Sequence, residues 1–329
     1  MATKTSTLPP SSRAGRERVS TRSTPPNGTS VREGKPLPGE VMIQGESVSI
    51  CLLLNRRHGH LRVIDFRAGP TVAKRNTILI AARREGIEKV FTLVERDEVL
   101  TWMRLGFSRE GTIPGFYRRS DAWVMGIVVS EARPLSASMA LDDDDDDLPM
   151  EAPATPAAAL AERTVLRAKK LLRDEAAALP SVKLAPVSDA EAQKALQALQ
   201  KKGLALTSLS PFGRDTKRTS YSCASKGVSV MISAEDQPFF QNTYLELLAS
   251  PKNETERIAT TATLAVMTER LRAEGKVNAF AVVPADDLLL CASMLASGFR
   301  RSAALSSHLT IGGERKDAVV WSKRLVQAD

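Results

Sequence analysis

Two carboxylates at the ends of apolar segments are the side chains in this sequence best placed to accept a proton. Asp65 closes the apolar segment that begins at Leu61, and Glu95 follows the apolar segment from Val90 to Val94. Such a carboxylate can deprotonate an amine as a general base. Structural roles compete, because Asp65 also suits an ion pair with a nearby arginine, and Glu95 and Asp97 suit a helix N-cap or the helix dipole. The sequence leaves both interpretations open.

Metal-ligating residues are sparse. His58-Gly59-His60 holds two of the three histidines, and the third is His308. We expect a polar hairpin turn at the pair rather than a metal site. Cys51, Cys223 and Cys291 are far apart and odd in number, which favours reduced thiols in a cytoplasmic protein over disulfides or a metal centre.

Charge and hydropathy limit the classes of partner. The 329 residues carry a net charge of +8, and residues 1–40 contribute +4 of it, from seven Lys/Arg and three Glu. This basic tail has no interleaved aromatic residues, so we expect no nucleic-acid partner. No apolar run approaches the roughly 20 residues that span a bilayer, and no apolar segment follows the basic start. We therefore expect neither a membrane span nor a signal peptide.

Two low-complexity segments divide the chain. Residues 1–38 are rich in Ser, Thr and Pro, and residues 134–156 contain six consecutive aspartates, Asp142 to Asp147, with prolines on both sides. Like charges repel and proline cannot continue a helix, so we expect both segments to be disordered. They delimit one domain at 41–133 and a second at 157–329.

Apolar patterning predicts a mixed α/β fold in both domains. β-Branched apolar runs bounded by turns indicate strands, and stretches rich in Ala, Leu, Lys and Glu that end at glycine indicate helices. In the first domain we expect strands at 41–43, 48–54, 61–66, 90–94, 107–113 and 122–129, and helices at 71–85 and 96–105. In the second we expect helices at 157–179, 189–202, 239–248, 255–274 and 286–297, and strands at 204–209, 219–224, 228–233, 279–283, 299–309 and 318–325.

The two domains end alike. In each, a Glu-Gly pair, a buried strand, a short helix and a Gly-Phe pair follow in order, and an Asp-Ala pair then precedes an apolar strand with a tryptophan. The Gly-Phe pairs are Gly106-Phe107 and Gly298-Phe299, and the tryptophans are Trp123 and Trp321. Matching order and spacing predict an internal duplication.

This succession resembles the C-terminal half of the GNAT acyltransferase superfamily. The stretch Gly106 to Tyr117, followed by Asp121-Ala122, is similar to the end of β-lysine and related amino-group acetyltransferases. The resemblance covers about residues 61–129 and, less closely, 228–325. It implies two GNAT-like mixed-sheet units in tandem, acetyl-CoA or another acyl-CoA as cofactor, no metal, and an amine acceptor or a protein partner. We also expect the two repeats to pair within the chain.

The family binds the CoA diphosphate through a glycine-rich loop before a helix, where backbone N–H groups point at the phosphates. By resemblance, the residues that would bind the cofactor in the first copy are Arg67, Gly69, Thr71, Lys74 and Arg75. Pro70 removes one N–H from that loop. The matching segment of the second copy, 250–256, has no glycine and two glutamates, which predicts a non-catalytic copy.

Catalytic roles follow from the same resemblance. Asp65 or Glu95 would act as general base, and Trp102 occupies the place where the family often has a tyrosine that protonates the leaving thiolate. Phe116 and Tyr117 would line the acceptor site or pack between the two copies. Two functions remain open: an acyl-CoA-dependent N-acyltransferase acting through the first copy, or a catalytically inactive pseudo-acyltransferase that serves as a binding or scaffolding module.

Overall fold

The computed structural model describes residues 39–46, 48–66, 69–133, 155–173, 179–225 and 227–326. The segment 1–38 and most of 134–156, both expected to be disordered, lie outside the described residues, as does Arg67. In the described part, no helix is long and apolar enough to cross a membrane.

The first half follows the predicted order of elements closely. Its strand β4 is buried along its whole length, as its apolar sequence indicates. Helix α1 begins after Thr71, whose side chain accepts a hydrogen bond from the Lys74 N–H. The elements are β1 (Glu40–Gln44), β2 (Ser49–Asn55), β3 (His60–Asp65), α1 (Val72–Arg84), β4 (Lys89–Val94), the 3-10 helix η1 (Arg96–Glu98), α2 (Val99–Arg104), β5 (Ser108–Ile113), β6 (Ala122–Val128) and the 3-10 helix η2 (Val129–Glu131).

The second half departs from the sequence prediction in three places, the first of which is the strand β7 (Leu184–Val187), which was not predicted. Its elements are α3 (Pro156–Leu172), β7 (Leu184–Val187), α4 (Asp189–Lys201), β8 (Lys217–Ser225), β9 (Val228–Gln237), β10 (Asn242–Leu247), α5 (Glu254–Ala273), β11 (Asn278–Pro284), α6 (Leu288–Ala296), β12 (Arg300–Ile311) and β13 (Glu314–Arg324). The helix predicted at 239–248 is wrong, because this segment contains β10, paired with β9 and β11. The strand predicted at 204–209 is reduced to one isolated bridge, between Ala205 and Ala249. Pairing within the sheet overrides the helix propensity of Leu and Glu in β10.

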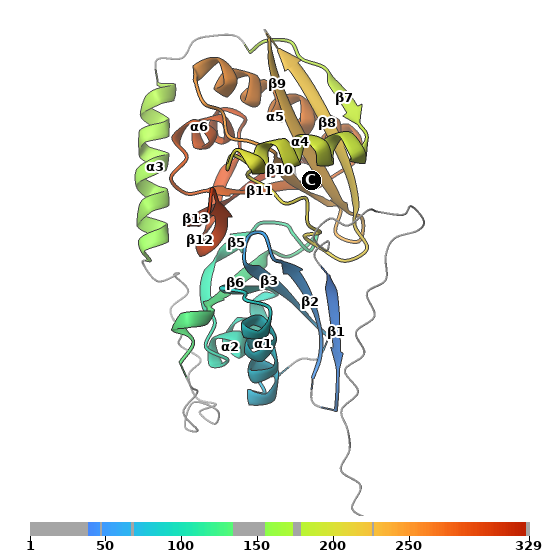
Figure 1. The fold of residues 1–329 in the computed structure, drawn as a ribbon, viewed down its shortest axis with the longest axis vertical. Helices are drawn as coiled ribbons and strands as arrows, with labels where there is room; N and C mark the ends of the chain where they lie inside the picture. The colour runs from blue at the N-terminus through green and yellow to red at the C-terminus, as the bar shows by residue number, and fades with distance from the viewer. Residues whose placement is uncertain are drawn as a thin grey trace, which may run out of the picture.

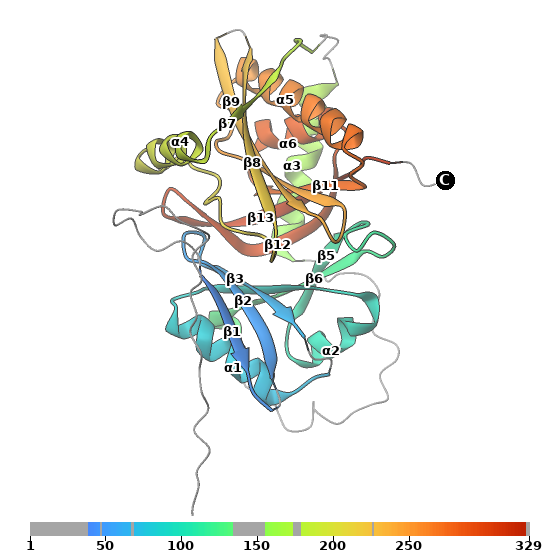
Figure 2. The same cartoon turned by 90° about the vertical axis from the view of Figure 1, so that its right-hand side faces the viewer.

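The thirteen strands of the described residues form one mixed sheet, which confirms the α/β class. Their order is β1-β2-β3-β4-β6-β5-β12-β13-β11-β10-β9-β8-β7. The helices α1 and α2 lie at one end of the molecule and α5 and α6 at the other, with strands between them (Figure 1; Figure 2). The inner faces of the two halves pack on each other through a shared apolar cluster that includes Phe91, Phe116, Phe212, Phe280 and Val320.

Each half contains one parallel pair of neighbouring strands with a short register. β3 pairs with β4 over four positions and stops at Val63 and Thr92. β10 pairs with β11 over four positions and stops at Leu245 and Ala281. All four strands continue beyond their last pair, so the sheet splits at the same place in both halves. We call these places the first opening, between β3 and β4, and the second opening, between β10 and β11.

The halves are joined by β5 and β12, which pair antiparallel at Gly111 and Ala303. A Cβ atom on Gly111 would lie 2.5 Å from the Cα of Ala303, and the φ of Gly111 is +135°. Only glycine adopts this backbone conformation readily and allows so close an approach. The joint between the halves therefore depends on Gly111.

The two tryptophans that suggested a duplication do not share a register position. Trp123 lies opposite Val94 of β4, whereas Trp321 lies opposite Ala281 of β11. The Asp-Ala pairs do match, because Ala122 pairs with Ile113 and Ala318 with Leu305. The order of strands and α-helices from β1 to β6 matches that from β8 to β13, and the tryptophans are no part of that likeness. The duplication itself stays a prediction.

Candidate ligand-binding cavity

The first opening contains a cavity of about 620 Å³. Its walls come from both halves of the chain. The first half contributes Arg62, Val63, Ile64, Asp65, Phe66, Thr92, Leu93, Val94, Glu95, Asp97, Glu98 and Tyr117, and the second contributes Gly213, Arg214, Asp215 and Gln237 to Phe240. A cavity of this size accommodates a small organic ligand.

Two hydrogen bonds define the inner end of the cavity. The Thr92 hydroxyl donates to the carbonyl oxygen of Val63 at 3.0 Å, where the register of β3 and β4 ends. The Tyr117 hydroxyl donates to the carbonyl oxygen of Leu93 at 2.9 Å. Beyond Val63 and Thr92 the two strands no longer pair with each other. A ligand with amide groups can therefore align between them as a peptide aligns at a strand edge.

Asp65, a predicted general base, lines the cavity but is already paired. Its Oδ2 lies 2.5 Å from the Nζ of Lys74, and the side chains of these two residues are 10% and 1% exposed. The same Nζ donates to the carbonyl oxygen of Gly69 at 2.8 Å. The partner of Asp65 is thus a lysine, where the sequence suggested an arginine, and the pair fixes the carboxylate at the cavity wall.

Three further carboxylates extend from the end of β4. Glu95 stands at the N-cap position of η1, but its side chain makes no capping hydrogen bond. Asp97 and Glu98 follow it in η1, and all three line the cavity. Burial, and to a lesser degree the negative charge of Asp65, raise the pKa of Glu98 above its usual value. Glu98 was missed by the sequence analysis, although it lies one turn beyond Glu95.

The two aromatic residues of the expected acceptor site have different surroundings. Tyr117 lines the cavity, and burial raises its pKa to about 12. Phe116 is fully buried instead, with ring centroids 5.3 Å from Phe240 and 5.7 Å from Phe280. Phe116 therefore packs between the halves, while Tyr117 faces the cavity.

The start of α1 is where the resemblance places a diphosphate. Gly69 has a φ of +99°, and a Cβ there would meet no atom within 4 Å. Thr71 caps the helix, and Lys74 is held by Asp65. Arg75 is buried and donates to the carbonyl oxygens of Leu105 and Arg133. Among the described residues here, both cations are engaged within the protein, and they do not fit a diphosphate as they stand.

Trp102 lies away from the cavity. It is 1% exposed, and its ring packs edge-on against Phe107 at a centroid distance of 4.8 Å. The Lys74 Nζ lies 5.9 Å from its centroid. The structure thus brings Asp65, Glu95 and Tyr117 together around one cavity, and places Trp102 and Phe116 in the core.

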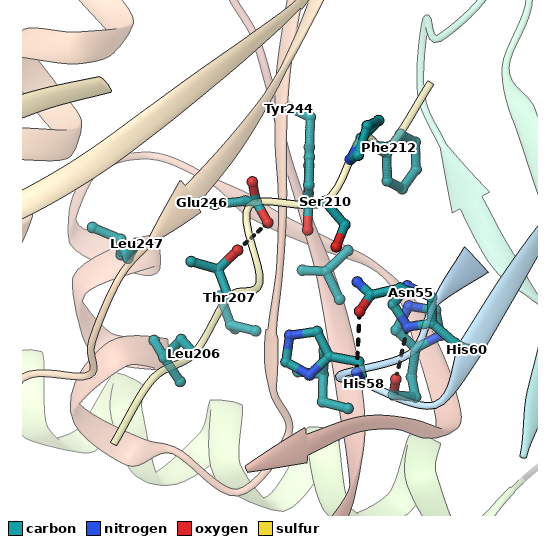
Figure 3. A pocket seen from close by; sticks show the side chains of 15 residues that line it. Asn55, His58, His60, Leu206, Thr207, Ser210, Phe212, Tyr244, Glu246 and Leu247 are labelled. Carbon is teal, nitrogen blue, oxygen red and sulfur yellow. Dashed lines mark hydrogen bonds between the residues drawn. The ribbon is translucent and has the colours of Figure 1, made fainter. Parts of the chain in front are cut away.

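The second opening is nearly filled. Its remaining space is about 30 Å³, enough for about one water molecule. The turn between β2 and β3 brings Asn55, His58 and His60 into it. The loop before β8 brings Leu206, Thr207 and Ser210 to Phe212 (Figure 3). The expected turn at His58-Gly59-His60 is confirmed. Its place inside the interface could not be inferred from sequence.

All three histidines of the chain meet at the second opening. The rings of His60 and His308 stack at a centroid distance of 4.5 Å, and those of His58 and His60 at 5.9 Å. The Nδ1 atoms of His60 and His58 lie 3.1 and 3.2 Å from the carbonyl oxygens of His308 and Thr310. Burial lowers the pKa of His58 to about 3 and of His60 to about 4, and lowers that of His308 as well. Among the described residues, no group of His, Cys, Asp and Glu is arranged to hold a metal.

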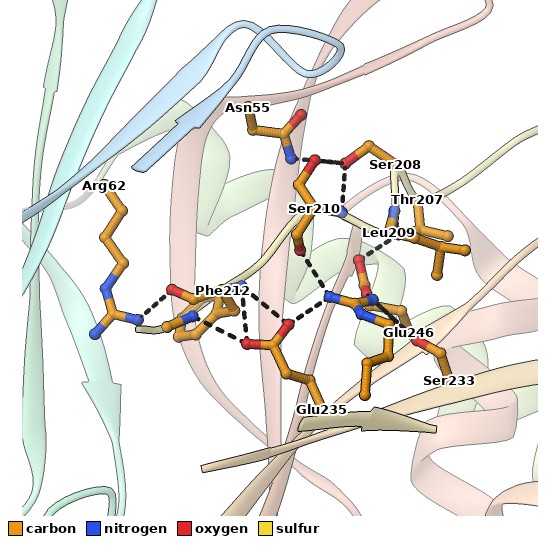
Figure 4. Close-up of polar contacts among 12 residues, drawn as sticks. Asn55, Arg62, Thr207, Ser208, Leu209, Ser210, Phe212, Ser233, Glu235 and Glu246 are labelled. Atoms are coloured by element: carbon orange, nitrogen blue, oxygen red, sulfur yellow. Dashed lines mark hydrogen bonds and ion pairs between the residues drawn. The ribbon is translucent and has the colours of Figure 1, made fainter. Parts of the chain in front are cut away.

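A buried polar network fixes the loop that covers the second opening (Figure 4). Glu235 accepts hydrogen bonds from the backbone N–H groups of Phe212 and Gly213, at 2.9 and 3.0 Å to its Oε1. Arg218 forms ion pairs with both Glu235 and Glu246 and donates to the carbonyl oxygen of Ser210 at 2.7 Å. The carboxylates near this opening are therefore neutralised and used for structure.

The start of α5, which follows β10, is occupied by its own side chains. Asn253 caps the helix, and the Glu256 Oε2 accepts a hydrogen bond from the Lys252 N–H at 2.8 Å. Glu254 forms an ion pair with Arg257 at 2.6 Å. An anion approaching this helix start would meet two carboxylates.

Comparisons with solved structures find similar folds, and the three described below cover 44–45% of this chain. No family model and no curated protein matches the sequence. The chain is similar to the ribosomal-protein-S18-alanine N-acetyltransferase of Escherichia coli, with a TM-score of 0.34 and 13% identity over 45% of this chain and 97% of that one. It is similar to the spermidine N-acetyltransferase of Vibrio cholerae solved with CoA and spermine (TM-score 0.36, 7% identity, 44% and 95% covered). It is also similar to an N-acetyltransferase of Staphylococcus aureus (TM-score 0.34, 7% identity, 45% and 100% covered).

Proposed function

We propose that this chain is a GNAT-like acyltransferase-fold protein whose first opening binds a cationic amine. The observation that carries the proposal is the cavity itself, where Asp65, Glu95, Asp97 and Glu98 gather beside Tyr117. Carboxylates attract an ammonium group strongly when water is partly excluded. Aromatic rings add a favourable surface for a cation and for its apolar chain.

Acyl transfer to that amine is the reaction that this arrangement supports. The amine must lose a proton before it can attack an acyl group, and a carboxylate with a raised pKa takes that proton more readily near neutral pH. Glu98 has this property, whereas Asp65 is held by Lys74. We therefore assign the general base to Glu98, and assign to Asp65 and Glu95 the electrostatic orientation of the ammonium group.

The cofactor that the resemblance implies is acyl-CoA, which supplies an acyl group activated as a thioester. The split between β3 and β4 fits the amide-bearing arm of CoA, since the two strands no longer pair with each other there. The start of α1 does not fit the diphosphate, because Lys74 and Arg75 are engaged elsewhere. These residues therefore assign no catalytic step to acyl-CoA.

The tandem arrangement belongs to the same proposal. Both halves have one parallel pair with a four-position register and the same order of the following elements, as two GNAT-like copies would have. In the second half, histidines and loop residues fill the opening and two glutamates occupy the helix start. We propose that this second copy is non-catalytic.

A binding module without transfer activity is the second candidate. The contacts of Lys74 and Arg75 at the start of α1 favour this candidate. Both side chains bind groups of the protein, so among the described residues neither is left to bind the diphosphate of acyl-CoA. Both candidates share the amine site and differ only in the use of acyl-CoA.

Mass-spectrometric detection of acylated product distinguishes the two candidates. The full chain is incubated with acetyl-CoA and a panel of amines that includes 1,5-diaminopentane, and its melting temperature is followed with acetyl-CoA alone. Product that falls about a hundredfold in Glu98→Gln, with no change in the exposed control Glu269→Gln, supports the transferase. Amine binding without product, and without stabilisation by acetyl-CoA, supports the binding module.

A further inference from the structure

The wall of the first opening that faces β3 and β4 belongs to the other half of the chain. The turn between β9 and β10 brings Gln237 to Phe240 to the cavity, and the loop before β8 brings Gly213 to Asp215. These segments are more than 100 residues away from Asp65 and Glu98 in sequence. A ligand that fills the cavity therefore touches both halves.

Two buried hydrogen-bond donors at this cavity lack an acceptor within the described residues. The Nε2 of Gln237, a side chain 4% exposed, has no hydrogen-bond partner. The Nε of Arg62, 8% exposed, has none either, although Nη1 of the same group donates to the carbonyl oxygen of Phe212 at 2.5 Å. A buried donor without an acceptor is unfavourable, and an acceptor supplied by a ligand relieves that cost. One such donor comes from each half.

Charge gives the second requirement on the ligand. The carboxylates of Asp65, Glu95, Asp97 and Glu98 line the first half's side of the cavity. Arg214, on the other side, forms an ion pair with Glu40 at 2.9 Å. A ligand that satisfies the whole cavity has an ammonium group near the carboxylates and an oxygen acceptor near Gln237 and Arg62.

We propose that the second half selects the ligand of the first half's site, with Gln237 as the specificity-determining residue. The ligand class is an amine that also carries a carbonyl oxygen, as an amino-acid amide or a peptide does, in preference to a simple alkyl diamine. This inference rests on the proposed role of the first opening as the amine site. It requires no acyl donor.

A matched pair of ligands tests the inference by isothermal titration calorimetry on the full chain without acyl-CoA. Lysinamide and 1,5-diaminopentane share two ammonium groups and one aliphatic chain, and differ by a carboxamide. We expect lysinamide to bind about tenfold more tightly, the size of one added hydrogen bond. Equal affinity of the wild-type protein for both ligands would overturn the inference without any mutation.

The variant Gln237→Leu keeps a side chain of similar size and removes the donor. It is expected to reduce the tenfold preference to less than threefold, by weakening the binding of lysinamide more than that of 1,5-diaminopentane. Gln197→Leu, on the exposed face of α4, is the matched control and should leave both affinities unchanged. An unchanged preference in Gln237→Leu overturns the role of Gln237. Lysinamide selectivity without any acetyl-CoA binding refutes only the transferase. Equal binding of both amines refutes only this inference, and binding of neither amine refutes the proposed amine site itself.

Discussion

The two openings of the sheet have similar backbone arrangements but differ in the side chains that line and fill them. Thr71 caps α1 eight residues after Val63, and Asn253 caps α5 eight residues after Leu245, where the respective parallel pairs end. Yet the first opening contains about 620 Å³ of space and the second about 30 Å³. The same split between parallel strands is therefore a ligand site in one half and part of the core in the other.

The difference lies in what each half inserts into the other. The β9–β10 turn reaches the first opening at its edge and leaves the space between the strands free. The β2–β3 turn fills the second opening with His58 and His60, and the loop held by Glu235 closes it. Carboxylates line the cavity in the first opening. At the second opening, Glu246 forms an ion pair with Arg218. Side chains on the inserted turns thus decide which opening can hold a ligand.

The largest expected effect concerns the joint on which both openings depend. Gly111→Val places a branched side chain against Ala303 and forces a positive φ on it. Overpacking and backbone strain together should lower the free energy of unfolding by about 4 kcal/mol. Urea denaturation measures this loss, with Gly115→Ala as control, since its φ is also positive but no atom lies near. A loss in Gly111→Val no larger than in the control would contradict the proposed joint.

Lowering the pH should destabilise the fold through the buried histidines of the second opening. The folded-state pKa values of His58, His60 and His308 lie below the usual histidine value, so the unfolded chain binds these protons first, and stability falls as the pH drops below about 6.5. At pH 5.5 each histidine that stays neutral costs about 1.4 kcal/mol, or roughly 4 kcal/mol for the three. Urea denaturation at pH 7.5 and 5.5 measures the loss. Histidine NMR signals that titrate near pH 6.5 would show that the rings are not buried in this way.

Charge removal in the first opening should weaken amine binding by about tenfold. Glu95→Gln with Glu98→Gln removes two of the carboxylates that face the ligand, while Glu269→Gln with Glu274→Gln removes two exposed ones on and beside α5. Calorimetry with 1,5-diaminopentane compares the pairs. The raised pKa of Glu98 means that this carboxylate ionises at a higher pH than usual. The affinity of the wild-type protein for 1,5-diaminopentane should therefore also increase as the pH rises and Glu98 loses its proton. Equal weakening in both double variants would indicate long-range charge only.

The smallest expected effect compares the two helix starts. Thr71→Ala and Asn253→Ala each remove a side-chain acceptor from a helix N-terminus and should each lower the free energy of unfolding by about 1 kcal/mol. Thermal denaturation measures both. If Thr71 also bound an anion, Thr71→Ala would lower the free energy of unfolding by more in the presence of acetyl-CoA than in its absence. No such difference is expected for Asn253→Ala.

The sequence predicted the frame of the first opening and little of its chemistry. The β-branched run at β4 and the glycine-closed helix patterns identify the elements, since their burial follows from local composition. β10 was missed because Leu and Glu favour a helix until two neighbouring strands pair with them. The places of Gln237 and His308 could not be inferred, because the first-half residues that line the same openings lie more than 100 residues away along the chain. Glu98 was within reach, as the third acidic residue in the segment that begins at Glu95.

The Gly111–Ala303 contact also bears on how each half would behave alone. Gly111 lies four residues after Phe107, and Ala303 lies four residues after Phe299, so residues at matching places face each other across an antiparallel pair. Two identical subunits related by a two-fold axis meet in this way. The single register pair of β5 and β12 has the arrangement of such a contact. A half produced by itself would present β5 or β12 as a bare edge strand, and such edges associate with one another.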